Sequence, residues 1–411
     1  MRHAVPKLLG LALLLTSAPV AAAPPGHDQA PGQSFHITAD SLPAPGATAS
    51  ASAPPSAIKR GEHVPLVPAG FTAALVVEGL ENPRRLLSRE DGPLYFVQQS
   101  LGRILKLNDL DGDGSADQGG LVMEGALNPF GIATVPVGEF KGDLLVADQD
   151  AVYRLPLVSP GLAFKQVTPD GSFGEPKGHI TRSLAVDPTS GEIYVGVGSM
   201  SNVGEEDPVK ATIQRYAPDG TGQTTFAIGM RNVTAMAFEP TSHALYAVTM
   251  ERDGMGDELV PDYLTRVNEG DNFGWPYQYT GGFVQPEFSG RGMKLAAAKL
   301  PDVLFEAHSA PLDVAFIPDS WPAAWRGDAL VALHGSWNAG APRGYKVVRV
   351  PFTDGKPDGT YDNFMTGFWV SGDSPAEVWG RPAALTFDKA GNLFVADDLG
   401  NTIWRVTPPS K

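Results

Sequence analysis

The stretch RSLAVDPTSGEIYVGVG, residues 182–198, decides the fold, because it joins two apolar runs through a polar turn. Short apolar runs separated by polar turns are typical of antiparallel strands. Five further copies of the pattern are RRLLSREDGPLYFVQQSLGRILKLN from Arg84, FGIATVPVGEFKGDLLVADQDAVYRLPL from Phe130, TAMAFEPTSHALYAVT from Thr234, LDVAFIPDSWPAAWRGDALVALHGSW from Leu312 and PAALTFDKAGNLFVADDLGNTIWRV from Pro382. The repeats predict an all-β fold, a six-bladed β-propeller of four-stranded antiparallel blades.

The spacing of the copies supports this fold. The first copies start roughly 50 residues apart, which suits blades of four strands, and the wider later gaps leave room for inserted loops such as residues 280–299. The strand FTAALVV, residues 71–77, is expected to complete the last blade and so close the ring without an exposed sheet edge. An open solenoid is the structural alternative.

The N-terminal region is predicted to lie outside the propeller. Residues 1–23 have the charged start, short apolar run and small-residue end of a signal peptide, so we expect a periplasmic or secreted protein. Residues 24–66 are rich in Ala, Pro and Ser and are expected to form a disordered leader. Residues 67–411 are then expected to form the propeller domain. No later segment is long and apolar enough to predict a membrane span.

Composition excludes several classes of function. The formal net charge of −15 argues against a nucleic-acid partner, which would require clustered Lys and Arg. The chain has no cysteine, which excludes a disulfide framework, a lipoprotein anchor and a covalent c-type haem. Electrons from any redox reaction must therefore leave through a separate carrier, which we expect to be a soluble acceptor.

Polar residues recur just before the inner strand of each predicted blade. In a propeller these positions meet at one rim of the central channel, so their side chains should form a polar, partly cationic pocket. The residues are Asn82-Pro83, Asn128-Pro129, His179, Arg231-Asn232, His308-Ser309 and Arg381-Pro382. The Asn-Pro pairs also suit simple turns. The His and Arg residues predict a site for an anionic ligand and a general base.

At these positions the sequence resembles the glucose/sorbosone dehydrogenases that depend on pyrroloquinoline quinone (PQQ). The resemblance extends from about Phe71 to Val406, and the order of its blocks along the chain carries it. The blocks are GHITRSLAVDP, IGMRNVTAMAFEP, ERDGMGDEL followed by DNFGWPY, HSAPLDVAF, HGSWN with GYKVVRV, and WGRPAALTFDKAGNLFVADD. The family resemblance implies a PQQ- and calcium-dependent enzyme that oxidises an aldose or a sorbosone-like aldehyde by hydride transfer to the quinone.

The resemblance also implies roles for single residues. His179 matches the general base that takes the hydroxyl proton of the sugar, a task suited to imidazole. Arg231 matches the cation beside the quinone oxygen where negative charge grows, and Asn232 matches its neighbour that holds the cofactor. Arg381 matches a contact to a cofactor carboxylate. Further candidates for cofactor contact are Asn128, His308 and His334.

Two stretches are candidates for calcium. The loop ERDGMGDEL, residues 251–259, resembles the calcium loop of the family, with backbone carbonyls of Arg252, Asp253 and Gly254 as the expected ligands. The stretch DLDGDGSAD carries aspartates at the early positions of an EF-hand-like loop, although its twelfth position is Gly120 rather than a glutamate. A hairpin turn is the alternative there. The candidate ligands of the EF-hand-like loop are Asp109, Asp111, Asp113 and Asp117.

The chain departs from the family pattern at two positions. The glucose enzymes have an acidic residue before the base, where this chain has Gly178, and a lysine near the segment that holds His334 to Trp337. Lys346 falls in the next strand instead. Two other functions therefore stay open. One is a calcium-dependent sugar lactonase, which would be expected to place carboxylates on the channel axis, and the other is a propeller that binds a ligand without catalysis.

Overall fold

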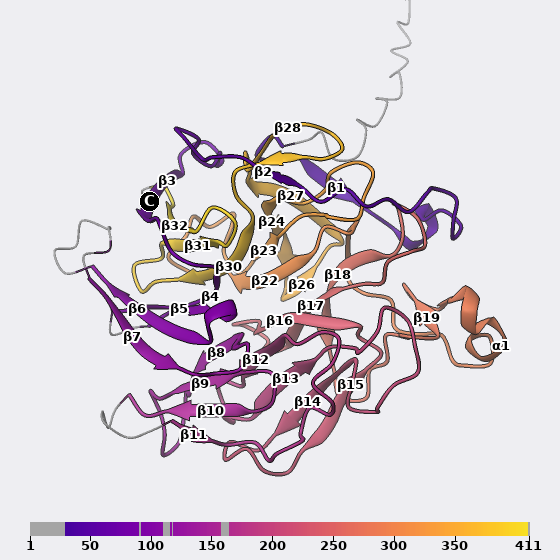
Figure 1. Ribbon diagram of the computed structural model, residues 1–411, viewed down its shortest axis with the longest axis horizontal. Coiled ribbons are helices and arrows are strands. Elements are labelled where there is room, and N and C mark those ends of the chain that lie inside the picture. The colour runs from indigo at the N-terminus through magenta and orange to yellow at the C-terminus, as the bar shows by residue number, and fades with distance from the viewer. Residues whose placement is uncertain (1–28, 90–91, 110–115, 117, 158–163, 410–411) are drawn as a thin grey trace, which may run out of the picture.

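The computed structural model describes residues 29–89, 92–109, 116, 118–157 and 164–409 (Figure 1). The predicted signal peptide, residues 1–23, lies outside the described residues. The helical elements of the described part are short: η1 (Ala39–Ser41), η2 (Gln99–Leu101), η3 (Pro286–Phe288) and α1 (Ser289–Gly292). None of them has the length and apolar character needed to cross a membrane.

Within the described residues, six antiparallel sheets of four or five strands make up most of the fold. The first three are β4 (Pro83–Ser88) to β7 (Gln118–Glu124) through β5 (Leu94–Gln98) and β6 (Arg103–Asn108); β8 (Gly131–Thr134), β9 (Leu144–Ala147), β10 (Val152–Leu155) and β11 (Lys165–Gln166); and β12 (Arg182–Val186), β13 (Ile193–Val197), β14 (Thr212–Tyr216) and β15 (Thr224–Ile228). The prediction of an all-β fold with four-stranded antiparallel sheets is confirmed.

The other three sheets follow the same order with insertions. They are β16 (Asn232–Phe238), β17 (Leu245–Met250), β18 (Pro261–Val267) and β21 (Val303–Ala307); β22 (Pro311–Phe316), β23 (Ala329–Leu333), β24 (Lys346–Val350), β27 (Thr360–Met365) and β1 (Ser34–His36); and β30 (Pro382–Phe387), β31 (Leu393–Asp397), β32 (Thr402–Thr407) and β3 (Thr72–Val77). Smaller pairings join β19 (Gln278–Tyr279) with β20 (Phe283–Val284), β25 (Phe352–Thr353) with β26 (Lys356–Pro357), and β29 (Glu377–Val378) with β28 (Trp369–Ser371) and β2 (Ser56–Ala57).

The innermost strands, one from each of the six sheets, form a closed ring. Strands β4, β8, β12, β16, β22 and β30 contact one another in this order, and β30 contacts β4. The pairing predicted for residues 71–77 is present, because β3 adds to β32 and so completes the sheet that holds the C-terminal repeat. The arrangement is consistent with a β-propeller, and it brings the starts of the six inner strands together.

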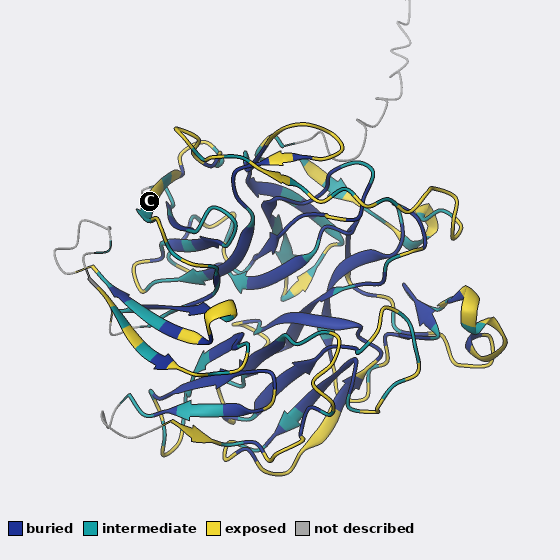
Figure 2. Cartoon of the chain, in the orientation of Figure 1, coloured by how far each residue is buried: buried dark blue, intermediate teal, exposed yellow. Residues whose placement is uncertain are grey.

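The apolar runs are explained by packing of the sheets face to face. Strands β13 (IYVGV) and β23 (ALVAL) are buried on both faces, since each sheet is covered by its two neighbours (Figure 2). One core cluster joins Ala147 and Val152 of one sheet with Val195 and Tyr216 of the next. The outer strand β15 (TTFAI) is exposed at Thr224, Thr225 and Ile228. Beyond it lies only a short backbone contact, in which Ile228 bridges to Asn272.

The prediction of a disordered leader over residues 24–66 is corrected for residues 29–66, which lie against the sheets. Strand β1 pairs with β27, and Phe35 stacks on Tyr361 with ring centroids 4.9 Å apart. Strand β2 pairs with β29, and the Ile58 amide donates to the Val378 carbonyl at 2.9 Å. Composition measures how much apolar surface a segment can bury, and it does not register backbone hydrogen bonds to an open sheet edge elsewhere in the fold.

Candidate active site

The starts of the inner strands enclose a polar cavity of about 300 Å³. It lies at the lower end of the roughly 300–1,000 Å³ that is usual for small-molecule sites. Its lining includes Arg84, His179, Arg231, Asn232, Asp253 and His308. A larger cavity of about 540 Å³ lies at the other ends of the same strands, and none of the predicted site residues lines it. The structure thus brings together four residues predicted to share a pocket: His179, Arg231, Asn232 and His308.

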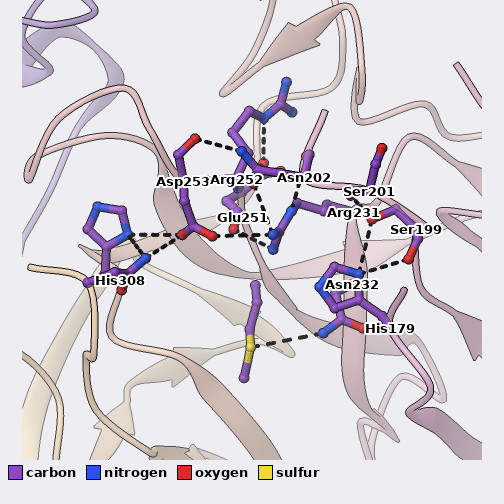
Figure 3. A network of polar contacts seen from close by, with 12 residues as sticks. His179, Ser199, Ser201, Asn202, Arg231, Asn232, Glu251, Arg252, Asp253 and His308 are labelled. Carbon is purple, nitrogen blue, oxygen red and sulfur yellow. Dashed lines mark hydrogen bonds and ion pairs between the residues drawn. The ribbon is translucent and has the colours of Figure 1, made fainter. Parts of the chain in front are cut away.

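His179 precedes β12 and is held by Ser199. Its Nδ1 lies 2.9 Å from the Ser199 carbonyl and 3.1 Å from the Ser199 hydroxyl (Figure 3). A carbonyl only accepts, so this contact places the proton on Nδ1 and leaves the lone pair of the neutral ring on Nε2. Burial and the nearby Arg231 lower the pKa of His179 to about 4. The ring is therefore neutral at physiological pH and able to take a proton at Nε2.

Two glycines allow this histidine its position. Gly178 has φ +71°, and a Cβ there would lie 2.3 Å from the Cα and carbonyl oxygen of Met200. The acidic residue expected before the base in the glucose enzymes would therefore not fit without a backbone shift. A Cβ on Gly198 would lie 2.6 Å from both the Cβ of His179 and the Oδ1 of Asn232. Gly198 therefore allows the base and the amide to pack side by side.

We expect Gly198→Ala to lower any activity of this site strongly while the protein still folds, because the new methyl group must displace His179 or Asn232. A misplacement of about 1 Å can cost a rate factor of about a hundred. The measurement compares turnover with the thermal unfolding temperature. Gly290→Ala in α1 is the control, since a Cβ there meets nothing within 4 Å. Full activity of Gly198→Ala would show that the packing around His179 is not needed.

Arg231 is buried and fixed by several acceptors. Its Nη1 donates to the Glu251 carbonyl at 2.7 Å, and its Nη2 donates to Asn202 Oδ1 at 3.0 Å. Nη2 also lies 3.4 Å from a carboxylate oxygen of Asp253. The neighbouring Asn232 has a buried Oδ1 without a hydrogen-bond partner among the described residues. The site thus combines a rigid cation with a polar atom that still lacks a partner.

Both ring nitrogens of His308 have partners. Nε2 lies 3.1 Å from the Gly256 carbonyl, while Nδ1 lies 3.2 Å from Asn338 Nδ2 and 3.4 Å from Asp253 Oδ1. Burial would lower the pKa of His308, but the hydrogen bonds to Asp253 and Gly256 raise it overall. This ring is therefore a poorer proton acceptor for a ligand than His179, whose Nε2 has no contact of this kind among the described residues.

His334 and Arg381 belong to a second polar cluster, which is connected to the cavity through Arg84. His334 Nε2 lies 2.7 Å from Asp398 Oδ1, and Arg84 contacts both of them. Burial and the nearby Arg381 lower the pKa of His334 to about 3, so this ring is neutral. Arg381 donates to the carbonyls of His334 and Gly335. Neither His334 nor Arg381 lines the cavity, and a direct cofactor contact for them stays a prediction.

Asn128 also lies apart from the cavity. It has φ +50° and donates its Nδ2 to Gln149 Oε1 at 2.9 Å. Asn82, the matching residue of the first repeat, has the same φ of +50°. A left-handed Asn is typical of a turn, so the structure favours the turn interpretation of the two Asn-Pro pairs.

The loop of residues 251–259 borders the cavity. The Arg252 side chain is buried away from it and pairs with Glu251 at 2.9 Å, so Arg252 can offer only its backbone. Burial would raise the pKa of the Asp253 carboxyl, but His308 and Arg231 lower it overall, so the group is anionic. Gly254 has φ +91° and open space beside it. Among the described residues, no group of three or more His, Cys, Asp or Glu side chains forms a metal cluster.

The second calcium stretch is mostly outside the described residues. Asp109, Asn108 and Asp388 line a separate cavity of about 220 Å³, which includes no residue of the loop 251–259. Asp111, Asp113 and Asp117 fall outside the described residues, so this candidate site stays a prediction.

Sequence reasoning missed residues that line the cavity or hold the side chains that line it. Arg84 supplies a cation from β4, whereas Lys346 is buried on β24 with its Nζ 3.9 Å from Glu306. Asn202 bridges the site, since its Oδ1 accepts from Arg231 and from the Asp253 amide at 2.9 Å. The position of Arg84 directly after Asn82-Pro83 was an available signal. Asn202 lies in a loop whose path no repeat predicts.

Known structures share this fold over most of the chain. The holo form of the pyranose dehydrogenase PQQ domain from Coprinopsis cinerea is 20% identical, with a TM-score of 0.70 over 86% of this chain and 99% of that chain. A calcium structure of carbohydrate-active enzymes family AA12 from Trichoderma reesei is 20% identical, with a TM-score of 0.70 and the same coverage. These likenesses show that the fold is shared, a nearly all-β architecture that is consistent with a β-propeller.

The match to a family model covers a shorter part of the chain than the structural matches, and this part contains several residues of the candidate site. Residues 164–336 match the family Glucose / Sorbosone dehydrogenase, and residues 293–409 match a family described as TrAA12-like. The resemblance to the glucose/sorbosone dehydrogenases is thereby confirmed, and the first match contains His179, Arg231 and His308. An uncharacterized protein of Borreliella burgdorferi is 29% identical over 233 residues, which is 56% of this chain. The match spans 60% of the length of that curated relative.

Proposed function

We propose that the protein is a six-bladed β-propeller dehydrogenase that uses PQQ and calcium to oxidise an aldose or a sorbosone-like aldehyde. Residues 67–411 form the catalytic domain, the electrons pass to a soluble acceptor, and the protein acts in the periplasm or outside the cell. One observation carries the proposal: a neutral His179 with a free Nε2 lies in the same buried cavity as the rigid guanidinium of Arg231.

The residues of the cavity fit PQQ, which is an anionic aromatic quinone with three carboxyl groups. Arg84 and Arg231 line the cavity as cations, and fixed guanidinium groups suit carboxylate and quinone oxygens. The buried Oδ1 of Asn232 lacks a partner and can accept a hydrogen bond from a ligand. Arg84 supplies the positive charge that the absent family lysine would otherwise provide.

The loop of residues 251–259 fits calcium. The cation prefers hard oxygen ligands, and the loop offers the anionic Asp253 carboxylate together with backbone carbonyls near Gly254. Gly254 has no side chain, and nothing lies within 4 Å of the position that its Cβ would occupy, so its backbone is accessible to an ion. The fit supports the predicted positions 252–254 and adds the Asp253 carboxylate as a further oxygen donor.

The chain's own residues divide the chemistry between them. When bound, PQQ supplies the two-electron acceptor for the hydride of the sugar. His179 takes the hydroxyl proton at Nε2, while Ser199 holds the ring through Nδ1. Arg231 places a fixed positive charge beside the cavity, where it stabilises negative charge that grows during the reaction. Because the donors are already oriented, little reorganisation is needed in the transition state.

The carboxylates of the cavity argue against the lactonase alternative. Asp253 is paired with Arg231, Asn338 and His308. Asp262 accepts from the amides of Glu251 and Ala310, both at 2.8 Å. Asp262 is thereby occupied, and of these two carboxylates only Asp253 belongs to the proposed calcium loop, whereas a sugar lactonase would be expected to place several carboxylates on the channel axis.

We expect PQQ and calcium together to restore electron transfer from an aldose to an artificial acceptor, and a chelator to abolish it. The reason is that Asp253 and its loop would hold the ion, and the ion in turn would hold the quinone. The measurement is dye reduction by the apo protein with each addition alone and with both. Activity that survives exhaustive chelation, with metal absent by elemental analysis, would contradict the calcium role. Lactone hydrolysis without PQQ would favour the hydrolase instead.

A further inference from the structure

An N-terminal segment crosses the candidate calcium loop. Figure 1 shows this part of the chain, in indigo, passing from β1 to β2 and on to β3. Residues 46–53 of this segment, here called the strap, bond to the loop of residues 251–259. Gly46 donates its amide to the Met255 carbonyl at 2.8 Å, and the Gly256 amide donates to the Ser50 hydroxyl at 3.0 Å. Both polar groups of the Met255–Gly256 peptide unit are therefore bonded to the strap.

A third bond and a close approach strengthen this contact. The Asp257 amide donates to the Thr48 hydroxyl at 2.9 Å. Gly256 has φ +112°, and a Cβ there would lie 2.7 Å from the carbonyl and hydroxyl oxygens of Thr48. The backbones of strap and loop therefore meet at a point that only glycine permits. Side-chain hydroxyls of the strap take the place that water would have on a free loop.

The loop residues that bond to the strap are connected by hydrogen bonds to residues that line the cavity. The Gly256 carbonyl accepts from His308 Nε2, and His308 and Asn338 contact the Asp253 carboxylate. The strap also reaches the other side of the cavity mouth, because Ala53 donates its amide to the Trp337 carbonyl at 2.8 Å. Trp337 lines the cavity and is half exposed. One short segment thus holds two loops that flank the same pocket.

We propose that the strap is a positioning element of the metal site: Thr48 and Ser50 fix the loop of residues 251–259 so that its oxygens are placed for calcium. This inference rests on the proposed function, since it concerns the same calcium site. The loop contains glycine at positions 254 and 256 and would sample many conformations if it were free. Hydroxyl caps on two of its amides remove part of that freedom before the ion binds, which increases affinity through preorganisation.

The test uses the full chain without cofactor and compares the wild type with the double variant Thr48→Val/Ser50→Ala. Calcium binding is measured by calorimetry with calcium chloride alone. Hydrogen exchange is measured on the peptide that covers residues 253–258. We expect calcium affinity to fall on the order of tenfold and the exchange of the 256 and 257 amides to accelerate by a similar factor, because two hydrogen bonds are lost. Thr48→Ser/Ser50→Thr retains both hydroxyls and should restore both values.

Ser34→Ala is the matched control. It removes a hydroxyl from the same N-terminal segment on β1, where Ser34 donates to Asp362 rather than to the loop. It should leave calcium affinity and loop exchange unchanged. Equal calcium affinity and equal amide exchange in Thr48→Val/Ser50→Ala and the wild type would overturn the strap alone. A wild type that binds no calcium at all would overturn the proposed function, and the metal role of the strap with it.

Discussion

His179→Gln is expected to fold, bind PQQ and calcium, and reduce the quinone about a hundred- to ten-thousand-fold more slowly than the wild type when sugar is added. A general base is needed in the transition state far more than for holding the cofactor. The structure supports this separation, because the bonds of His179 run to Ser199 and its Nε2 is free within the described part of the chain. Stopped-flow absorbance of the quinone measures the step directly.

The pH dependence gives this prediction a second observable. A lowered pKa means that His179 is protonated only below about pH 4, and it is neutral and able to act as a base above that value. In the cofactor-free protein an NMR titration should therefore find this ring neutral throughout the range from pH 5 to 8, where ordinary histidines titrate. A midpoint near the ordinary value of about 6.5 would show that the ring is more solvated than the structure describes.

His308→Gln is the internal control for the base. His308 also precedes an inner strand, but both of its ring nitrogens are bonded, to Gly256 and to the Asn338 and Asp253 side chains. Loss of His308 should lower the calcium affinity of the loop of residues 251–259. It should have a smaller effect on the rate of quinone reduction in protein loaded with PQQ and calcium. If loaded His179→Gln reduced the quinone at a near-normal rate while loaded His308→Gln did not, His308 would be the base.

Arg231→Lys should lower turnover about a hundredfold although it keeps the positive charge. Arg231 bonds through separate nitrogens to the Glu251 carbonyl and to Asn202 Oδ1, and its Nε lies 3.3 Å from the Asn202 carbonyl. A single ammonium cannot reproduce this planar fork, so its charge would move relative to the cavity. The measurement is turnover at saturating sugar with the chemical step shown to be rate-limiting.

Arg215→Lys provides the comparison for this substitution. Arg215 also makes a bidentate pair, with both oxygens of Glu269 at 3.1 Å, but the pair lies at the surface. A surface ion pair contributes little, so turnover should be unchanged. Equal turnover of Arg231→Lys and wild type under the same conditions would remove Arg231 from the redox role.

The repeats predicted much of the fold because sheet packing leaves a direct trace in sequence. Runs such as IYVGV and ALVAL are apolar on both faces since each sheet has two neighbours. The closure by β3 followed from the need to cover a sheet edge. The order of residues 29–66 was not predicted because it comes from backbone bonds to β27, to β29 and to the Met255 carbonyl, which composition does not encode.

The site was predictable where residues lie at a repeated position and less so elsewhere. His179, Arg231, Asn232 and His308 share the start of inner strands, and the ring brings those starts together. Arg381 occupies the same position, yet its donors are used by the carbonyls of His334 and Gly335. Side-chain direction is settled by such local acceptors. Asn202 and Asn338 come from irregular loops, so neither period nor spacing pointed to them.

A single turnover of the quinone in reconstituted protein tests whether this chain is a PQQ-dependent sugar dehydrogenase. The wild type is loaded with PQQ and calcium, freed of excess cofactor, and mixed with a panel of aldoses in the absence of any electron acceptor. We expect one bound PQQ per chain and its conversion to the reduced form by at least one sugar, followed by reoxidation when an acceptor is added. Protein that binds no PQQ, or bound PQQ whose spectrum no sugar changes, would contradict the proposed function.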